Sequence, residues 1–171
     1  MNALVGESVH VAGAAMRPLL RSDREPLAGI LGATGVFGDD EIAIALELID
    51  AVLDKPDQQD YIINVYQDAR GLAGYYCLGP TPATAGTFDL YWIAVDPNRH
   101  GQGIGSQLML HAEALVRARD GRLIIVETSS RPAYEPTRRF YRTVGYEEIA
   151  HIAGYYRPGD DLVVFGKYVS Q

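Results

Sequence analysis

Three alternating glycines, at positions 101, 103 and 105, are the feature that most constrains how this chain can fold. They stand between an expected strand at residues 87–95 and an expected helix at residues 103–119, after the strand-ending sequence Asp96-Pro97-Asn98. The apolar run at residues 123–126 then predicts a strand that is buried on both faces. Because a strand–helix–strand unit in one sheet makes a right-handed crossover, these two strands are expected to be parallel.

The remaining segments predict further strands and helices on either side of this unit. Apolar residues at helical spacing between Ile42 and Leu53 predict a helix that begins at Asp39 and is stopped by Pro56. Other helices are expected at residues 23–33, after a capping box formed by Ser22 and Glu25, and at residues 136–143. Strands are expected at residues 16–20, 61–67, 72–78, 146–155 and 162–168. The sequence therefore predicts an α+β fold with a mixed, mainly antiparallel sheet of about seven strands and about four helices.

The composition limits the classes of partner and site. The length fits one domain at residues 16–171, with residues 1–15 as a flexible leader. The formal net charge is −7 and no stretch is rich in Lys or Arg, which argues against a nucleic-acid partner. No apolar run approaches the ~20 residues that span a bilayer. The single cysteine, Cys77, excludes an intramolecular disulfide and a cysteine-based zinc site. It is compatible with a cytoplasmic location. No metal is expected.

The glycine turn has the properties of an anion site. Glycine lets a ligand approach the main chain, and the free amides and dipole at a helix start favour an anion such as a diphosphate. A tight turn that binds nothing would also fit. The dinucleotide fingerprint needs its third glycine one residue after Gly105, and the nucleoside-triphosphate loop needs a lysine that does not follow these glycines. Both of these phosphate-binding motifs therefore fail in detail.

Two segments resemble the GNAT superfamily of acetyl-CoA-dependent N-acetyltransferases. Residues 93–108, IAVDPNRHGQGIGSQL, look like its cofactor motif, Q/R-x-x-G-x-G/A after the fourth strand, with His100 where the family has Arg or Gln. Residues 137–146, TRRFYRTVGY, look like its second motif, A-x-x-F/L-Y-x-x-x-G-F/Y. The helix and buried strand between the two motifs also match. The resemblance covers roughly residues 16–168.

This resemblance implies a GNAT-like α/β/α arrangement, a sheet splayed between the parallel fourth and fifth strands, and acetyl-CoA as co-substrate. The pantetheine arm would pair with the end of the fourth strand at Ile93, Ala94 and Val95. Arg138, one of four arginines after the buried strand, is a candidate for binding the negative charge of CoA, although a solvated helix face also explains it. The diphosphate would lie on the turn formed by His100, Gly101, Gln102, Gly103, Ile104, Gly105 and Ser106.

Three side chains are candidates for the transfer chemistry. Tyr141 matches the family tyrosine that protonates the leaving thiolate, and a phenol with a pKa around ~10 carries a proton at neutral pH. A packed aromatic is the alternative interpretation. Two carboxylates are candidates for the base that deprotonates the amine: Asp89, near the start of the fourth strand, and Glu127, at the end of the fifth. Either carboxylate could instead cap a strand end or form a salt bridge. The resemblance also implies that the amide near Val95 stabilises the oxyanion.

The resemblance implies acetyl transfer from acetyl-CoA to the primary amine of a small molecule, by direct attack in a ternary complex. The alternatives are an acyltransferase acting on a protein N-terminus or lysine, and a CoA-binding regulatory module without turnover.

Loops at residues 37–40, 79–86 and 155–161 are expected to shape the acceptor pocket. His111 is expected on a helix surface, and the last strands offer an edge at which a homodimer could pair. Aromatic candidates for the pocket lining are Tyr75, Tyr76, Tyr91, Trp92, Tyr134, Tyr155 and Tyr156.

Overall fold

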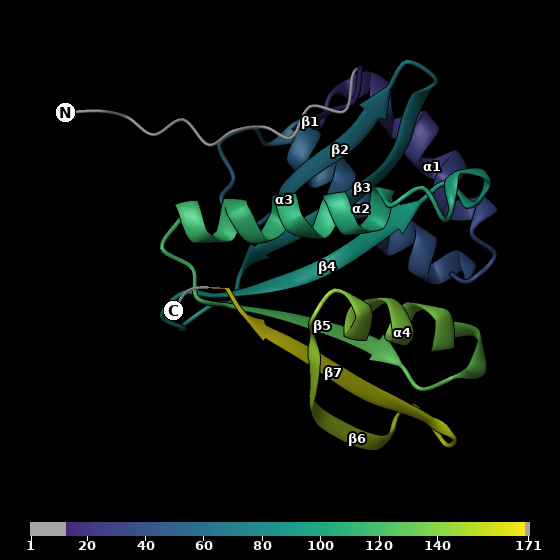
Figure 1. Ribbon diagram of the computed structural model, residues 1–171, viewed down its shortest axis with the longest axis vertical. Coiled ribbons are helices and arrows are strands. Elements are labelled where there is room, and N and C mark those ends of the chain that lie inside the picture. Colours follow the sequence, from purple (N-terminus) through teal and green to yellow (C-terminus); the bar gives the residue numbers. More distant parts are fainter. Residues whose placement is uncertain (1–12, 170–171) are drawn as a thin grey trace.

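A mixed sheet of seven strands, in the order β1-β2-β3-β4-β5-β7-β6, forms the centre of the computed structural model, which describes residues 13–169 (Figure 1). The strands are β1 (Ala15–Pro18), β2 (Ile62–Asp68), β3 (Gly71–Pro80), β4 (Thr87–Val95), β5 (Leu123–Ser129), β6 (Glu147–Arg157) and β7 (Asp160–Tyr168). The helices are α1 (Arg24–Ala33), α2 (Asp39–Asp54), α3 (Ile104–Ala118) and α4 (Glu135–Thr143). The predicted fold class is confirmed. The expected leader lies almost wholly outside the described residues, and β1 begins at Ala15.

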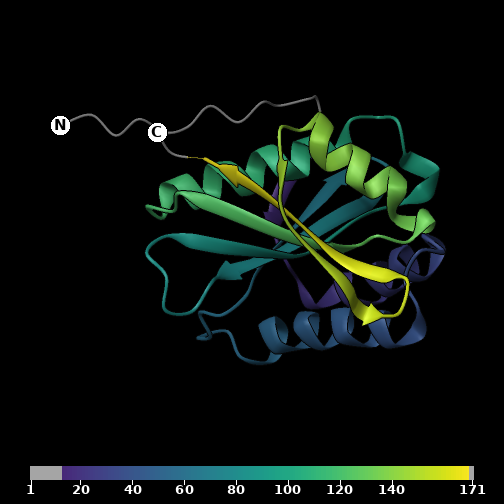
Figure 2. The same cartoon turned by 90° about the horizontal axis from the view of Figure 1, so that it is seen from below.

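Helices cover both faces of the sheet (Figure 2). On one face, α1 and α2 place Leu27 and Ile49 in a buried cluster with strand residues such as Val65. On the other face, α3 and α4 contribute to a second cluster, in which Leu108 and Tyr141 lie with residues of β5 and β7. The centre of the sheet is therefore buried on both faces, which explains the long run of buried residues in β3.

The antiparallel part of the sheet agrees with the sequence, but the start of α1 does not. β1 to β4 pair antiparallel in chain order, in agreement with the mainly antiparallel sheet that was predicted. The predicted capping box at Ser22 and Glu25 is wrong, because a short 3-10 turn, Arg21–Asp23, precedes α1. The Asp23 carboxylate instead accepts a hydrogen bond from the Leu20 amide at 2.8 Å and forms an ion pair with the Arg17 guanidinium at 2.7 Å. Aspartate favours caps as strongly as serine does, so residue types alone do not place the cap.

β4 and β5 separate halfway along their length, which confirms the predicted splay. They pair in parallel only between residues 87–90 and 123–126. At that point Trp92 pairs with Cys77 and Leu90 with Leu78, which leaves Tyr91 without a partner in β3. Such a bulge bends a strand and increases its twist. The β5-facing edge of β4 from Tyr91 to Val95 therefore has no partner strand in the described sheet.

The C-terminal strands form a hairpin in which the last strand is the inner one. β7 pairs antiparallel with both β5 and β6, so β6 lies at the sheet edge. The loop expected at residues 155–161 is shorter in the structure, since β6 extends to Arg157, which pairs with Asp160 across a tight turn. Of the helices in residues 13–169, none is long and apolar enough to cross a membrane.

Candidate active site

The glycine turn lines a cavity of about 420 Å³ between the end of β4 and the start of α4. Gly101 and Gly103 both have φ of +75°. Apart from each glycine and its two chain neighbours, no atom of residues 13–169 lies within 4 Å of the position that a Cβ would occupy. The first amides of α3, which have no partner inside the helix, are therefore accessible to a ligand. At Gly105 a Cβ would lie 3.1 Å from the Phe140 ring. The glycine lets the turn approach α4, so the two sequence motifs meet in space.

An ion pair supports this turn from the side of the sheet. The buried guanidinium of Arg99 binds the Asp68 carboxylate of β2, a contact that holds the pKa of Asp68 below its usual range. Arg99 Nε also donates to the Gln102 side chain at 3.2 Å, so this predicted cofactor residue uses its side chain within the turn. His100 Nε2 lies 3.2 Å from the carbonyl oxygen of Val95, at the unpaired end of β4.

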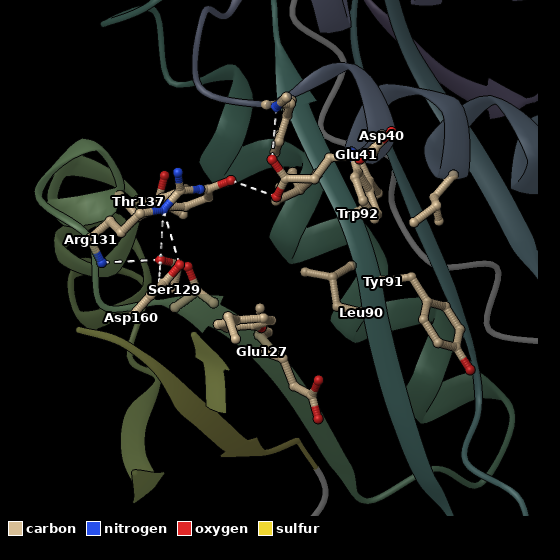
Figure 3. Close-up of a pocket in the computed structure, with 18 of the residues that line it drawn as sticks. Asp40, Glu41, Leu90, Tyr91, Trp92, Glu127, Ser129, Arg131, Thr137 and Asp160 are labelled. Atoms are coloured by element: carbon tan, nitrogen blue, oxygen red, sulfur yellow. Dashed lines mark hydrogen bonds and ion pairs between the residues drawn. The ribbon is translucent and has the colours of Figure 1, made fainter. Parts of the chain in front are cut away.

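A second cavity, of about 1100 Å³, lies between β4, β5 and the first turn of α2 (Figure 3). It shares Ile93 and Thr137 with the first cavity, so the two meet where β4 and β5 diverge. The predicted loops at residues 37–40 and 155–161 contribute to its lining, whereas the loop at residues 79–86 does not. Of the predicted aromatic candidates, four line it: Tyr91, Trp92, Tyr134 and Tyr156.

Tyr141, the predicted acid, lines this second cavity from α4. It is only 4 % exposed, and its ring centroid lies 6.1 Å from that of Tyr146 and 5.7 Å from that of Phe165. No hydrogen bond joins its hydroxyl to another group of residues 13–169. Burial raises the pKa of this phenol above its usual value, so the hydroxyl keeps its proton throughout the neutral range.

The two candidate bases line the same cavity from neighbouring strands. Asp89 is half-buried on β4, and its carboxylate accepts a hydrogen bond from the Thr81 hydroxyl at 2.7 Å. Glu127 is exposed on β5, one residue beyond the last parallel pair. Figure 3 shows its carboxylate pointing away from the group formed by Arg131 and Asp160. Neither candidate has a salt-bridge partner in the part of the chain that is described.

Arg138 lines neither of the two cavities. Its buried guanidinium donates to the backbone carbonyls of Ser129 and Arg131 and to the Glu135 carboxylate, the last at 2.8 Å. These bonds attach α4 to the end of β5. Helical spacing groups Arg138 with other arginines but does not reveal which of them faces the interior. Since its donors are used inside the fold, Arg138 is not retained among the cofactor-binding residues proposed below.

A buried carboxylate at the end of β5 was not predicted from the sequence. Asp160 accepts a hydrogen bond from the Ser129 hydroxyl and forms ion pairs with Arg131 at 3.2 Å and Arg157 at 3.6 Å (Figure 3). These residues line the larger cavity. They come from β5, the segment after it and the β6–β7 hairpin, so no local motif marks them.

A hydrogen bond across the cavity was also missed. The Tyr134 hydroxyl donates to one Glu41 oxygen at 2.8 Å, and the Gly38 amide donates to the other at 2.8 Å. Figure 3 shows both bonds meeting at the Glu41 carboxylate. Burial, together with the negative charge of Glu41, raises the pKa of Tyr134. The first bond links α2 to the segment before α4, and such distant positions give no joint sequence signal.

His111 differs from its expected place on a helix surface. It is half-buried on α3, and its Nδ1 lies 2.9 Å from the Tyr76 hydroxyl, which also accepts a hydrogen bond from Asn64 at 3.1 Å. Burial lowers the pKa of His111. Among residues 13–169, no three His, Cys, Asp or Glu side chains lie together where they could hold a metal ion.

Comparisons with known proteins agree on one family. The family model described as an acetyltransferase (GNAT) domain matches residues 59–148. A Desulfovibrio desulfuricans structure assigned to the GNAT family of acetyltransferases is 39 % identical, with a TM-score of 0.88 over 92 % of this chain and 99 % of that one. Escherichia coli ribosomal-protein-S18-alanine N-acetyltransferase has the same fold at 17 % identity, with a TM-score of 0.72 over 92 % and 95 % of the chains. Salmonella typhimurium YncA, solved with its cofactor acetyl-CoA, is 16 % identical, with a TM-score of 0.71 over 94 % and 96 %. No curated protein sequence matches significantly.

Proposed function

Because this chain belongs to the GNAT family of acetyltransferases, an acyltransferase class, we propose that it transfers the acetyl group of acetyl-CoA to the primary amine of a small molecule in a ternary complex. The observation that carries the proposal is the junction of the two cavities at Ile93 and Thr137. One cavity offers open backbone amides to an anionic donor. The other offers carboxylates to a cationic acceptor, and the two molecules would meet at the junction.

The residues around the smaller cavity fit CoA. The diphosphate would accept hydrogen bonds from the amides at the start of α3, where Gly101 and Gly103 leave the backbone open. The pantetheine arm would add to the free edge of β4 as an extra strand. His100 would exchange its contact with the Val95 carbonyl for one with the cofactor. The proposed cofactor residues are Ile93, Ala94, Val95, His100, Gly101, Gly103, Ile104, Gly105 and Ser106, with the backbone of Gln102.

The side chains of the larger cavity would move the protons of the reaction. Acetyl-CoA supplies an activated acetyl group, whereas an alkylammonium acceptor with a pKa near ~10.4 must first lose a proton. Asp89 or Glu127 would take that proton, and the amide near Val95 would donate a hydrogen bond to the oxygen that gains negative charge. Tyr141 would give its proton to the departing sulfur. The products are an amide and a free thiol.

The variants Asp89→Asn and Glu127→Gln separate the two candidate bases. A general base typically contributes about 10²–10⁴ in rate. We therefore expect the variant that removes the base to lose at least about 100-fold in kcat at pH 7, and to recover as the pH approaches the pKa of the amine. The other variant should stay close to wild type. If both variants keep the wild-type kcat, neither carboxylate is the base.

Calorimetric titration with acetyl-CoA, followed by thiol release over a panel of amines, tests the proposed function. We expect binding that Gly103→Ala weakens and turnover with at least one small primary amine. Absence of binding would contradict the cofactor assignment. Binding without turnover would favour a regulatory module, and acetylation confined to peptide N-termini or lysines would overturn the acceptor class alone.

A further inference from the structure

The larger cavity holds more carboxylates than its arginines can pair with. Six of its lining residues are Asp or Glu, and two are Arg. Both arginines form their ion pairs with the same residue, Asp160. The other five carboxylates have no cation within 4.0 Å in the part of the chain that the structure describes: Asp39, Asp40, Glu41, Asp89 and Glu127.

Carboxylates in the body of the fold are paired instead. Asp23 binds Arg17 at 2.7 Å, and Glu113 binds Lys167 at 2.8 Å. Unpaired charges of one sign around a concave, low-dielectric surface repel one another and attract a cation. The contrast indicates that the cavity carboxylates are arranged for a positively charged occupant that is not among the described residues.

Among the five cavity carboxylates without a cation partner, Glu41 has the most fixed orientation. Each of its oxygens accepts one hydrogen bond, from Tyr134 on one side and from the Gly38 amide on the other, both at 2.8 Å. Tyr134 is only 6 % exposed, so its hydroxyl is held in place by packing. A carboxylate has about four lone-pair sites, of which two are used here. Both donors are neutral, so the charge of Glu41 remains available to an ammonium group.

We propose, building on the acetyl transfer proposed above, that the acceptor is a small amine with at least two positive charges, and that Glu41, oriented by Tyr134, binds the ammonium group that does not react. The reacting amine would lie at the junction beside Ile93 and Thr137, and the second charge near the first turn of α2. Trp92 and Tyr134 also line this cavity, where an aromatic ring can contact an alkyl chain or a cation.

The walls of the cavity favour a small molecule over a peptide. Its volume of about 1100 Å³ lies just above the range of about 300–1,000 Å³ for clefts that hold small molecules. Its walls come from α2 on one side and from the β6–β7 hairpin, through Tyr156 and Arg157, on the other. A linear diamine or polyamine would lie between these walls with a charge at each end.

The test compares a linear diamine with a monoamine of the same chain length, measured as kcat/KM from thiol release. We expect the wild-type protein to prefer the diamine by at least about tenfold, the scale of one charge-assisted contact. Glu41→Gln should lower this preference by about tenfold or more, and Tyr134→Phe by less. The two changes combined should lower it little further than Glu41→Gln alone, because they act on one contact.

Glu47→Gln is the matched control, because Glu47 is exposed on the same helix, lines neither cavity, and its replacement removes the same charge. It should leave the preference unchanged. Melting temperatures show whether each variant folds. If Glu41→Gln does not fold, Tyr134→Phe and the rise of the diamine KM with salt decide the outcome.

Three results would overturn the proposal. They are an unchanged preference in Glu41→Gln, a wild-type preference for the monoamine, and a preference for a lysine-containing peptide over both amines. Absence of thiol release with every acceptor would instead contradict the proposed acetyl transfer, so the two failures are distinguishable.

Discussion

Replacing Tyr141 by phenylalanine separates the chemistry of its hydroxyl from its role in packing. The ring is 4 % exposed, and phenylalanine retains its contacts with Tyr146 and Phe165. Because the hydroxyl has no hydrogen-bond partner in residues 13–169, its removal leaves no described group unsatisfied. We expect the free energy of unfolding to change by less than about 1 kcal/mol. Loss of a proton donor should lower kcat at least about 100-fold, which is ~2.7 kcal/mol of barrier.

Tyr146→Phe is the matched control for this experiment. The Tyr146 hydroxyl is buried and has no hydrogen-bond partner within the described part of the chain, and Tyr146 lines neither cavity. A continuous thiol assay gives kcat, and urea unfolding gives the stability of both variants. Tyr141→Phe should lose activity at unchanged stability, while Tyr146→Phe keeps both. Thiol release by Tyr141→Phe at the wild-type rate would refute the assigned role, and equal loss in both variants would point to packing of the ring cluster.

Three further predictions follow from the same geometry. Burial raises the pKa of Tyr141 above its usual value near ~10. We therefore expect kcat to rise with pH as the amine deprotonates, and any decrease in kcat to occur only above about pH 10. A decrease centred nearer neutral pH would contradict this. Because Gly103 has φ of +75°, Gly103→Ala should lower the free energy of unfolding in urea by about 1 kcal/mol and should also weaken acetyl-CoA binding. Gly154→Ala, at φ +62° on β6, should lower the free energy of unfolding but leave acetyl-CoA binding unchanged. Burial lowers the pKa of His111 below its unfolded value near ~6.5, so stability should be highest above that pH and fall as the pH drops through it; the same fall in His111→Asn would exclude this residue as the cause.

Local sequence signals were sufficient for most elements of the fold. The strand expected at residues 87–95 is β4, and α3 begins and ends within one residue of its prediction. These elements are bounded by Gly, Pro and Asp residues whose backbone preferences act locally. The insertion of β7 between β5 and β6 could not be read in this way, because strand composition does not specify which neighbour a strand pairs with.

The same distinction between local signals and long-range contacts applies to the candidate site. The glycine turn and Tyr141 lie in continuous motifs, so the sequence locates them directly. The bond between Glu41 and Tyr134 joins residues 93 apart, and Asp160 meets Arg131 only because β7 pairs with β5. Such contacts depend on the tertiary arrangement, and a single sequence carries no signal for them.

The central claim is that donor and acceptor meet where β4 and β5 diverge and that an acetyl group passes between them there. The most direct test supplies acetyl-CoA with an isotopically labelled acetyl group and a linear diamine, and follows the labelled amine by mass spectrometry together with free thiol. The account predicts one labelled amide for each thiol released by the wild-type protein, at a rate at least about 100-fold lower in Tyr141→Phe. Intact acetyl-CoA and no labelled product, with this diamine and with every other amine and peptide, would contradict it.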